Sequence, residues 1–122
     1  MTYRDSVIDY AHKKYKTRPE YLWARWPRYA VLRRGDNKKW YGVIMNVARG
    51  RLGMTGNGDV DILNVRVPAG LYDVLRGGNG FIRGYHMGGM WVSVLLDGTV
   101  ELSQICALLD TSYEPVKKKT AK

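Results

Sequence analysis

Basic residues interleaved with large aromatic rings form the clearest chemical pattern in this chain. The segment Trp23-Ala24-Arg25-Trp26-Pro27-Arg28-Tyr29 carries three rings and two arginines within seven residues. In nucleic-acid-binding proteins, rings of this kind stack on bases while cations contact phosphates. The alternative is that the rings cover the edge of a small core with arginine stems lying over them, and this alternative is favoured for Trp23 and Trp26.

The arginines of this region are the first predicted phosphate contacts. We expect four of them to be exposed, namely Arg25, Arg28, Arg33 and Arg34. Lys38 and Lys39 follow in a predicted turn and extend the same basic surface.

Charge is distributed unevenly along the chain. The net charge is +9, and residues 1–34 hold nine Lys and Arg against three Asp and Glu. Residues 35–113 hold seven of each sign, and residues 114–122 hold four lysines against one glutamate. Basic ends of this kind attract polyanions, so a nucleic acid is the predicted partner. A solvated surface that only confers solubility is the other interpretation.

Other chemistries find little support in the residue pattern. Gly53-x-x-Gly56-x-Gly58 leads into a predicted strand, whereas a dinucleotide fingerprint must open a helix. His12, His86 and Cys106 are scattered without the spacing of metal ligands. No nucleophile, base and orienting group occur as a recognisable set. We therefore predict a protein that is not an enzyme, with no catalytic residue, no cofactor and no metal.

Length and composition indicate one domain. A chain of 122 residues fits a single domain; we assign residues 1–116 to it and residues 117–122 to a basic C-terminal tail.

No apolar run approaches the roughly 20 residues that span a bilayer, so no membrane partner is expected. The single cysteine and the lack of a signal-peptide layout favour a cytoplasmic location. A monomer is the favoured oligomeric state.

Hydrophobic periodicity predicts the elements that must position these residues. Thr2 and Asp5 resemble a capping box at the start of the first helix. Alternation and helical spacing then predict the following order: a helix over residues 3–16, strands over 29–33, 40–47 and 59–67, a helix opened by Pro68, a short edge strand over 81–83, a strand over 90–96 and a last helix over 102–113.

This order is typical of an α+β fold. We predict a two-layer sandwich in which helices pack on one face of a largely antiparallel sheet, in the order α-β-β-β-α-β-α when the short edge strand over 81–83 is left uncounted. The other sheet face is then expected to be free, and strand alternation places four residues there. These residues, Asn64, Arg66, Trp91 and Ser93, form an alternative ligand face for a small molecule or a protein partner.

Several short motifs, in order, resemble the MmcQ/YjbR-like family of small bacterial proteins. The resemblance runs over residues 21–116 and rests on these words: Trp40-Tyr41-Gly42, Val60-Asp61-Ile62-Leu63-Asn64-Val65, Gly84-Tyr85-His86-Met87 with Trp91, Leu96-Asp97-Gly98, and Leu109-Asp110-Thr111-Ser112-Tyr113. Between Met87 and Trp91 this chain has Gly88-Gly89-Met90, where family members often carry Asn, Lys and His.

The resemblance implies a fold and a function for this chain. The family resembles the frataxin-type sandwich and carries a DNA-binding label that implies β-hairpin wings as contact elements. The wings correspond to residues 34–39 and 49–58, which adds Arg49 and Arg51 to the predicted contacts. Frataxins bind iron on an acidic ridge, whereas the first helix here is basic, so iron is not expected. The favoured function is a non-enzymatic nucleic-acid-binding module, with DNA as the nucleic acid.

Overall fold

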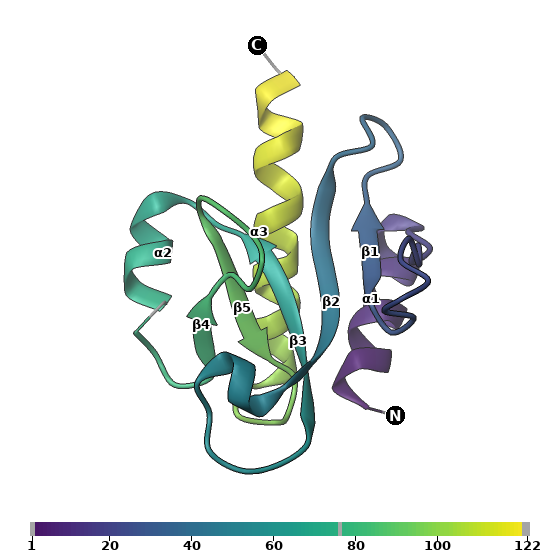
Figure 1. Ribbon diagram of the computed structural model, residues 1–122. Coiled ribbons are helices and arrows are strands. Elements are labelled where there is room, and N and C mark those ends of the chain that lie inside the picture. The colour runs from purple at the N-terminus through teal and green to yellow at the C-terminus, as the bar shows by residue number, and fades with distance from the viewer. Residues whose placement is uncertain (1, 76, 121–122) are drawn as a thin grey trace.

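The structure is a computed structural model that describes residues 2–75 and 77–120, with side chains as far as Glu114. Figure 1 shows its nine elements in chain order: α1 (Tyr3–Tyr15), β1 (Ala30–Arg33), β2 (Trp40–Ala48), the 3₁₀ helix η1 (Arg49–Leu52), β3 (Asp59–Arg66), α2 (Ala69–Leu75), β4 (Phe81–Arg83), β5 (Trp91–Leu95) and α3 (Leu102–Thr120). The predicted basic tail, residues 117–122, includes the last turn of α3, and its side chains lie outside the described part of the chain.

The five strands form one open antiparallel sheet. Their spatial order is β1-β2-β3-β5-β4, so β5 lies between β3 and the short edge strand β4. The register pairs Asn64 with Ser93 and Arg66 with Trp91 across β3 and β5. The predicted fold class and element order are confirmed.

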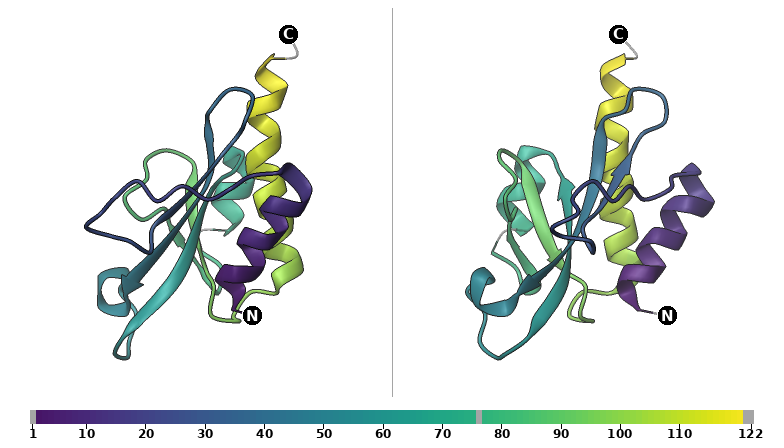
Figure 2. Two further views of the ribbon diagram at one scale, coloured as in Figure 1. Left: turned by 90° about the vertical axis from the view of Figure 1, so that its right-hand side faces the viewer. Right: turned by 45° about the vertical axis from the view of Figure 1, so that its right-hand side comes forward.

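The helices pack on one face of the sheet. Figure 2 shows α1 and α3 together on one side of the strands. Val7 of α1 and Ile105 and Leu109 of α3 are fully buried against Leu63 and Val65 of β3. These side chains follow the predicted helical stripe and strand alternation, so the first hydrophobic core was readable from periodicity.

Local signals also explain where α1 begins and ends. The Thr2 hydroxyl accepts from the Asp5 amide and the Asp5 carboxylate accepts from the Thr2 amide, which completes the predicted capping box. At the other end Lys16 has φ of 61° and its amide bonds to the Ala11 and His12 carbonyls. The chain therefore leaves the helix at Lys16.

The second face of the sheet is covered, contrary to expectation. It holds its own buried cluster, which includes Val43, Met45 and Ile62. Side chains from the 18–29 connection, from η1 and the residues after it, and from the loop after β4 pack over this cluster: Trp23, Tyr29, Leu52, Met54, Tyr85 and Met87. The prediction of a free face was wrong because alternation tells which way a strand residue points but not what a distant loop lays over it.

This cover changes the predicted alternative ligand face. Asn64 and Ser93 do point away from the helices, but both are fully buried. Trp91 and Arg66 remain half-buried, with the Arg66 guanidinium 5.7 Å from the Trp91 ring centroid. Met90, the first residue of the predicted strand over 90–96, precedes β5 and is 41% exposed. The predicted ligand face of Asn64, Arg66, Trp91 and Ser93 is therefore not an open surface.

Candidate functional site

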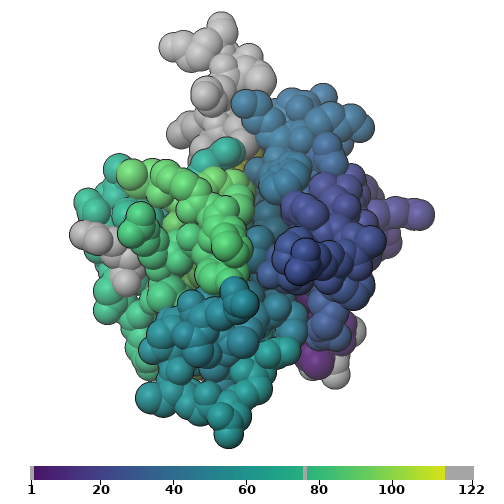
Figure 3. Space-filling view, in the orientation of Figure 1, coloured from purple at the N-terminus to yellow at the C-terminus, as the bar shows by residue number. Residues whose placement is uncertain are grey.

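Two adjoining hollows lie on the second face of the sheet, and we call them together the aromatic cleft. The polar half has a volume of about 310 Å³ and the apolar half about 320 Å³. Trp26, Tyr29 and His86 line both halves. Figure 3 shows this face, with segment 21–29 in dark blue, segment 49–58 in teal and segment 81–91 in green gathered around its middle.

The halves differ in the chemistry of their walls. The polar half is completed by Arg25, Asn46, Val47, Ala48, Arg51 and Tyr85. The apolar half is completed by Trp23, Trp40, Met45 and Met87. A ligand that spans the cleft therefore meets cations at one end and rings and thioethers at the other.

Segment 21–29 builds the aromatic wall through two short turns. The Trp26 amide donates to the Trp23 carbonyl and the Tyr29 amide donates to the Trp26 carbonyl, each at 3.1 Å. As a result the Trp26 and Tyr29 rings stack at 14° with centroids 5.7 Å apart, while Trp23 meets Tyr29 edge-on. Trp23 covers the core as expected, whereas Trp26 stays 46% exposed.

Two arginines flank this wall. The Arg25 guanidinium lies 5.4 Å from the Trp26 ring centroid, and both Arg25 and Arg51 are exposed. Neither forms an ion pair within the described part of the chain. Burial raises the pKa of Tyr29, and the neighbouring Tyr85 adds to that shift while the Arg51 charge opposes it. Tyr29 therefore keeps its hydroxyl proton at neutral pH.

The opposite wall is the loop that joins β4 to β5. Its first turn is held by a buried chain of hydrogen bonds: the Tyr85 amide donates to Ser93 Oγ at 2.9 Å, and Ser93 Oγ donates to Asn64 Oδ1. Asn64 Nδ2 in turn lies 3.4 Å from the Val43 carbonyl oxygen. His86 follows in the left-handed region, with φ of 60°. Asn64 and Ser93 thus position the wall without lining the cleft.

Carboxylate charge beside the cleft is already paired. Asp61 accepts from Asn46 Nδ2 at 2.9 Å and lies 3.7 Å from the Arg28 guanidinium. Arg28 is nevertheless exposed over more than half of its side chain. It remains able to contact a phosphate, at the expense of this weak ion pair.

Two further predicted phosphate contacts, Arg33 and Arg34, are already bonded within the protein. Arg33 makes a two-point hydrogen bond to the Glu20 carboxylate, at 2.7 and 3.1 Å. Arg34, predicted to be exposed, is only 3% exposed. It bonds to Asp36 and to the Tyr113 carbonyl, and its guanidinium lies 3.9 Å from the Tyr113 ring centroid. The expectation for Arg34 was wrong because the hairpin folds against α3.

Three other predicted contacts are more accessible. Lys38 and Lys39 are exposed at the β1–β2 loop, the first predicted wing, and have no ion pair to a described residue. Arg49, in the second wing, is half-buried in η1, a 3₁₀ turn that the glycine-rich sequence did not predict. The structure therefore brings Arg25 and Arg51 together at the cleft and places the two lysines at the hairpin.

Sequence reasoning missed several cleft residues. Asn46, Trp40 and Met45 lie on β2, and His86 and Met87 lie in the loop after β4. The motif Gly84-Tyr85-His86-Met87 was noticeable in the sequence, but nothing in it indicated that the loop would face segment 21–29. Only the pairing of β2 with β3 and of β3 with β5 brings these segments together.

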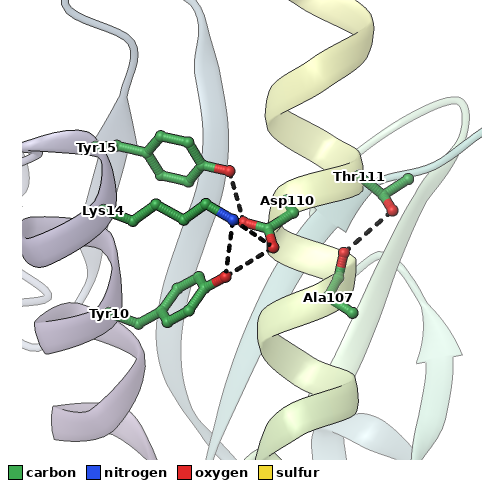
Figure 4. A network of polar contacts seen from close by, with 6 residues as sticks. All are labelled: Tyr10, Lys14, Tyr15, Ala107, Asp110 and Thr111. Carbon is green, nitrogen blue, oxygen red and sulfur yellow. Dashed lines mark hydrogen bonds and ion pairs between the residues drawn. The ribbon is translucent and has the colours of Figure 1, made fainter.

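A second polar network lies on the helix side of the molecule. Asp110 of α3 accepts hydrogen bonds from the Tyr10 and Tyr15 hydroxyls and from Lys14 of α1, as Figure 4 shows. Burial and the bonds to Asp110 raise the pKa of both tyrosines, which keeps them protonated as donors. This network ties α1 to α3, and we assign it a structural role.

Neither a metal-binding cluster nor a membrane-spanning helix is found among the described residues. Among the described residues no group of three or more His, Cys, Asp or Glu side chains is placed to hold a metal ion. Within the same residues no helix combines the length and apolar character needed to cross a bilayer.

Comparison with known proteins agrees with the fold and with the motifs. The chain is 41% identical to YyaQ, an uncharacterized protein of Bacillus subtilis, over 118 aligned residues. This alignment covers 96% of this chain and all of that protein. A Pseudomonas syringae protein solved by crystallography is 38% identical, with a TM-score of 0.85 over 89% of this chain and 94% of that one.

More distant structures share the architecture. A Deinococcus radiodurans crystal structure is 23% identical, with a TM-score of 0.73 over 98% of this chain and 82% of that one, which supports the fold alone. The YjbR family model matches residues 12–115, which contain every strand and both walls of the aromatic cleft. The chain therefore belongs to the YjbR family.

Proposed function

We propose that this protein is a non-enzymatic nucleic-acid-binding module whose main contact surface is the aromatic cleft. One observation carries the proposal: Arg25 and Arg51 are exposed, lack an ion pair to any described residue, and line the same hollow as the exposed ring of Trp26. Cations beside exposed rings are the combination that nucleic-acid-binding grooves use.

Phosphate contacts supply most of the affinity in this proposal. Each contact releases condensed counterions, so binding weakens as salt increases. Lys38 and Lys39 at the β1–β2 loop offer further contacts, and the net charge of +9 steers a polyanion toward the protein. DNA is the expected nucleic acid, following the predicted wings.

A binding role is supported over catalysis by the contents of the cleft. Catalysis needs a nucleophile or base oriented by a partner. The described lining residues include no carboxylate, cysteine or serine, and Tyr29 is held protonated. The His86 ring lies beside the Tyr85 ring, with centroids 4.2 Å apart and planes tilted by 59°, and no carboxylate lines either half to orient it.

Salt-dependent binding tests the proposal. Fluorescence anisotropy with labelled DNA and RNA oligonucleotides, from about 50 to 200 mM salt, should show log K falling by about 0.9 per contact on a duplex or about 0.7 on a single strand. Replacing Arg25 and Arg51 together by Ala should reduce this slope by about two contacts.

A matched charge removal is available on the other face. Arg83 is exposed, and its pairing with Val92 places it with the residues that point toward the helices. Arg83→Ala should leave the slope unchanged to within about half a contact. Absence of binding to every oligonucleotide at low salt, or equal slopes for the double variant and Arg83→Ala, would refute the proposal.

A further inference from the structure

We propose that the apolar half of the aromatic cleft receives one unpaired base of a nucleic-acid strand while Arg25 and Arg51 hold the adjoining phosphates. This assignment rests on the proposed function and specifies its ligand: a single strand, not a duplex. The reasons are the division of the cleft, the exposure of one ring, and the size of each half.

The division of the cleft matches the chemistry of a nucleotide unit. A nucleotide joins a flat, largely apolar base to an anionic phosphate. The two halves share Trp26, Tyr29 and His86, so a base among the rings leaves its phosphate near the two arginines. A bare anion would leave the apolar half empty, and a purely apolar ligand would leave the cations without a partner.

Trp26 provides the exposed stacking surface. Trp26 is 46% exposed although its ring stacks with Tyr29 and the Arg25 guanidinium lies 5.4 Å from the ring centroid. Trp23 and Trp40 meet edge-on deeper in the apolar half, at 89° and 6.0 Å, and this fixes the ring arrangement beside Trp26. Stacking of one base on such a platform contributes about 1–3 kcal/mol, with little dependence on base type.

The size and form of the cleft favour one unpaired base. Each half, at 310–320 Å³, lies at the small end of the range of about 300–1,000 Å³ for ligand pockets. In a duplex the base faces are covered by their neighbours, and only base edges are accessible in the grooves. Trp26 can reach a base face only when that base is unpaired.

Two single strands of equal phosphate count, with a duplex measured alongside, separate base from phosphate recognition. We would compare a thymidine single strand of about twelve nucleotides, the same strand with every base removed, and a duplex of equal length. At one salt concentration the single strand should bind at least about fivefold more tightly than the abasic strand. Equal affinity would overturn the base-binding assignment.

Trp26 is the variant that tests the position of the base. Trp26→Ala should lower affinity for the thymidine strand by at least about fivefold and leave affinity for the abasic strand unchanged. Tyr21→Ala is the matched control, because Tyr21 is 53% exposed and lines neither half of the cleft. An equal loss on both strands, or an equal effect of the two variants, would contradict the assignment.

Trp26→Phe gives a measurement that does not depend on the alanine variant folding. It keeps an aromatic ring in the wall, so it should retain most of the affinity. The fluorescence quenching that we expect when the strand is added to the wild-type protein should diminish in this variant. Quenching that persists in full would show that the base does not stack on Trp26 and would overturn the assignment of Trp26 as the stacking surface.

The same titrations distinguish a free nucleotide from a nucleic-acid strand as the ligand. They also distinguish failure of the unpaired-base assignment from failure of the proposed function. Free thymidine monophosphate should bind far more weakly than the strand, because it lacks neighbouring phosphates; equal affinity would point to a free nucleotide instead. If the abasic strand and the duplex bind as well as the thymidine strand, the unpaired-base assignment fails while the proposed function stands. If no oligonucleotide binds, both fail.

Discussion

Arg34 shows how a residue from the most basic part of the chain becomes part of the structural core. Its guanidinium lies on the Tyr113 ring and bonds to the Tyr113 carbonyl, 79 residues away in sequence. Its hydrogen bonds lower the pKa of Asp36 to about 2, so the partner carboxylate stays charged at all ordinary pH values. The contact holds the β1–β2 hairpin to α3, and the buried Arg34 guanidinium is not accessible to a ligand.

We predict that Arg34→Ala destabilises the protein. The change leaves the Tyr113 carbonyl without its donor and opens space beside the ring, so the free energy of unfolding should fall by about 2 kcal/mol. Urea unfolding followed by circular dichroism measures this. Lys39→Ala, an exposed change in the same hairpin, should stay within about 0.5 kcal/mol. Equal stability of the two variants would refute a structural role for Arg34.

Asp110 is the residue whose ionisation should couple stability to pH. Partial burial acts to raise its pKa, but the hydrogen bonds from Tyr15, Tyr10 and Lys14 outweigh burial and leave the pKa below the ordinary value of 3.8. A carboxyl with a depressed folded-state pKa stabilises the protein above its unfolded pKa. That contribution is lost as pH falls through the folded value.

Asp110→Asn should therefore lower stability at pH 7 by about 1–3 kcal/mol and by much less in acid. Urea unfolding of both proteins between pH 7 and pH 2–3 measures the difference. We expect the difference to shrink as pH falls below about 4. A difference that stays constant over this range would mean that the charge of Asp110 contributes nothing.

At the scale of elements, loops rather than strands complete the cleft. The sheet supplies Asn46 and Met45 as its floor, whereas the connection before β1 and the loop after β4 supply its facing walls. The second of these loops depends on a close backbone approach. A Cβ at Gly84 would lie 2.7 Å from the Trp91 carbonyl oxygen, and the Gly84 amide donates to that oxygen at 3.0 Å.

Gly84→Ala should separate β4 from β5 and displace the loop that carries His86. We expect a loss of about 1–3 kcal/mol in unfolding free energy, together with weaker oligonucleotide binding. Thermal unfolding and anisotropy measure the two effects. Gly88→Ala in the same loop is the control, because its Cβ would meet nothing within 4 Å. Should both variants behave alike, the close approach at Gly84 would not position the loop.

At the scale of the whole molecule, the two sheet faces differ in what covers them. The helix side holds the larger core and the network that ties α1 to α3. The second side holds a smaller cluster roofed by aromatic rings, and the exposed arginines stand at its edge. Binding on the second side should therefore stabilise the fold without rearranging the helices.

Ligand stabilisation is expected to depend on salt. At a thymidine-strand concentration about 100 times Kd, the free energy of unfolding should rise by about 2.7 kcal/mol, since the ligand binds the folded state. Thermal unfolding with and without the strand measures this rise, which should largely vanish at about 0.5 M salt as the affinity falls. A rise that is independent of salt would exclude phosphate contacts as the main source of affinity.

Local patterns in the sequence determined much of the fold. The capping pair Thr2 and Asp5, the alternation of Leu63 and Val65, and the stripe through Ile105 and Leu109 predicted elements and the first core correctly. Such patterns succeed because the periods of helix and strand decide which side chains share a face. The segment with alternating rings and arginines was likewise identified as the one bearing candidate contacts.

Only the tertiary structure decided which of those residues stand together and which are buried. Arg34 meets Tyr113, and Trp26 and Tyr29 share a cleft with His86, through contacts between segments that lie far apart in the chain. Asn64 and Ser93 were assigned to the correct face, but distant loops roof that face. Periodicity reports the direction of a side chain, whereas its burial depends on which remote segment packs against it, and that is settled by the whole chain folding at once.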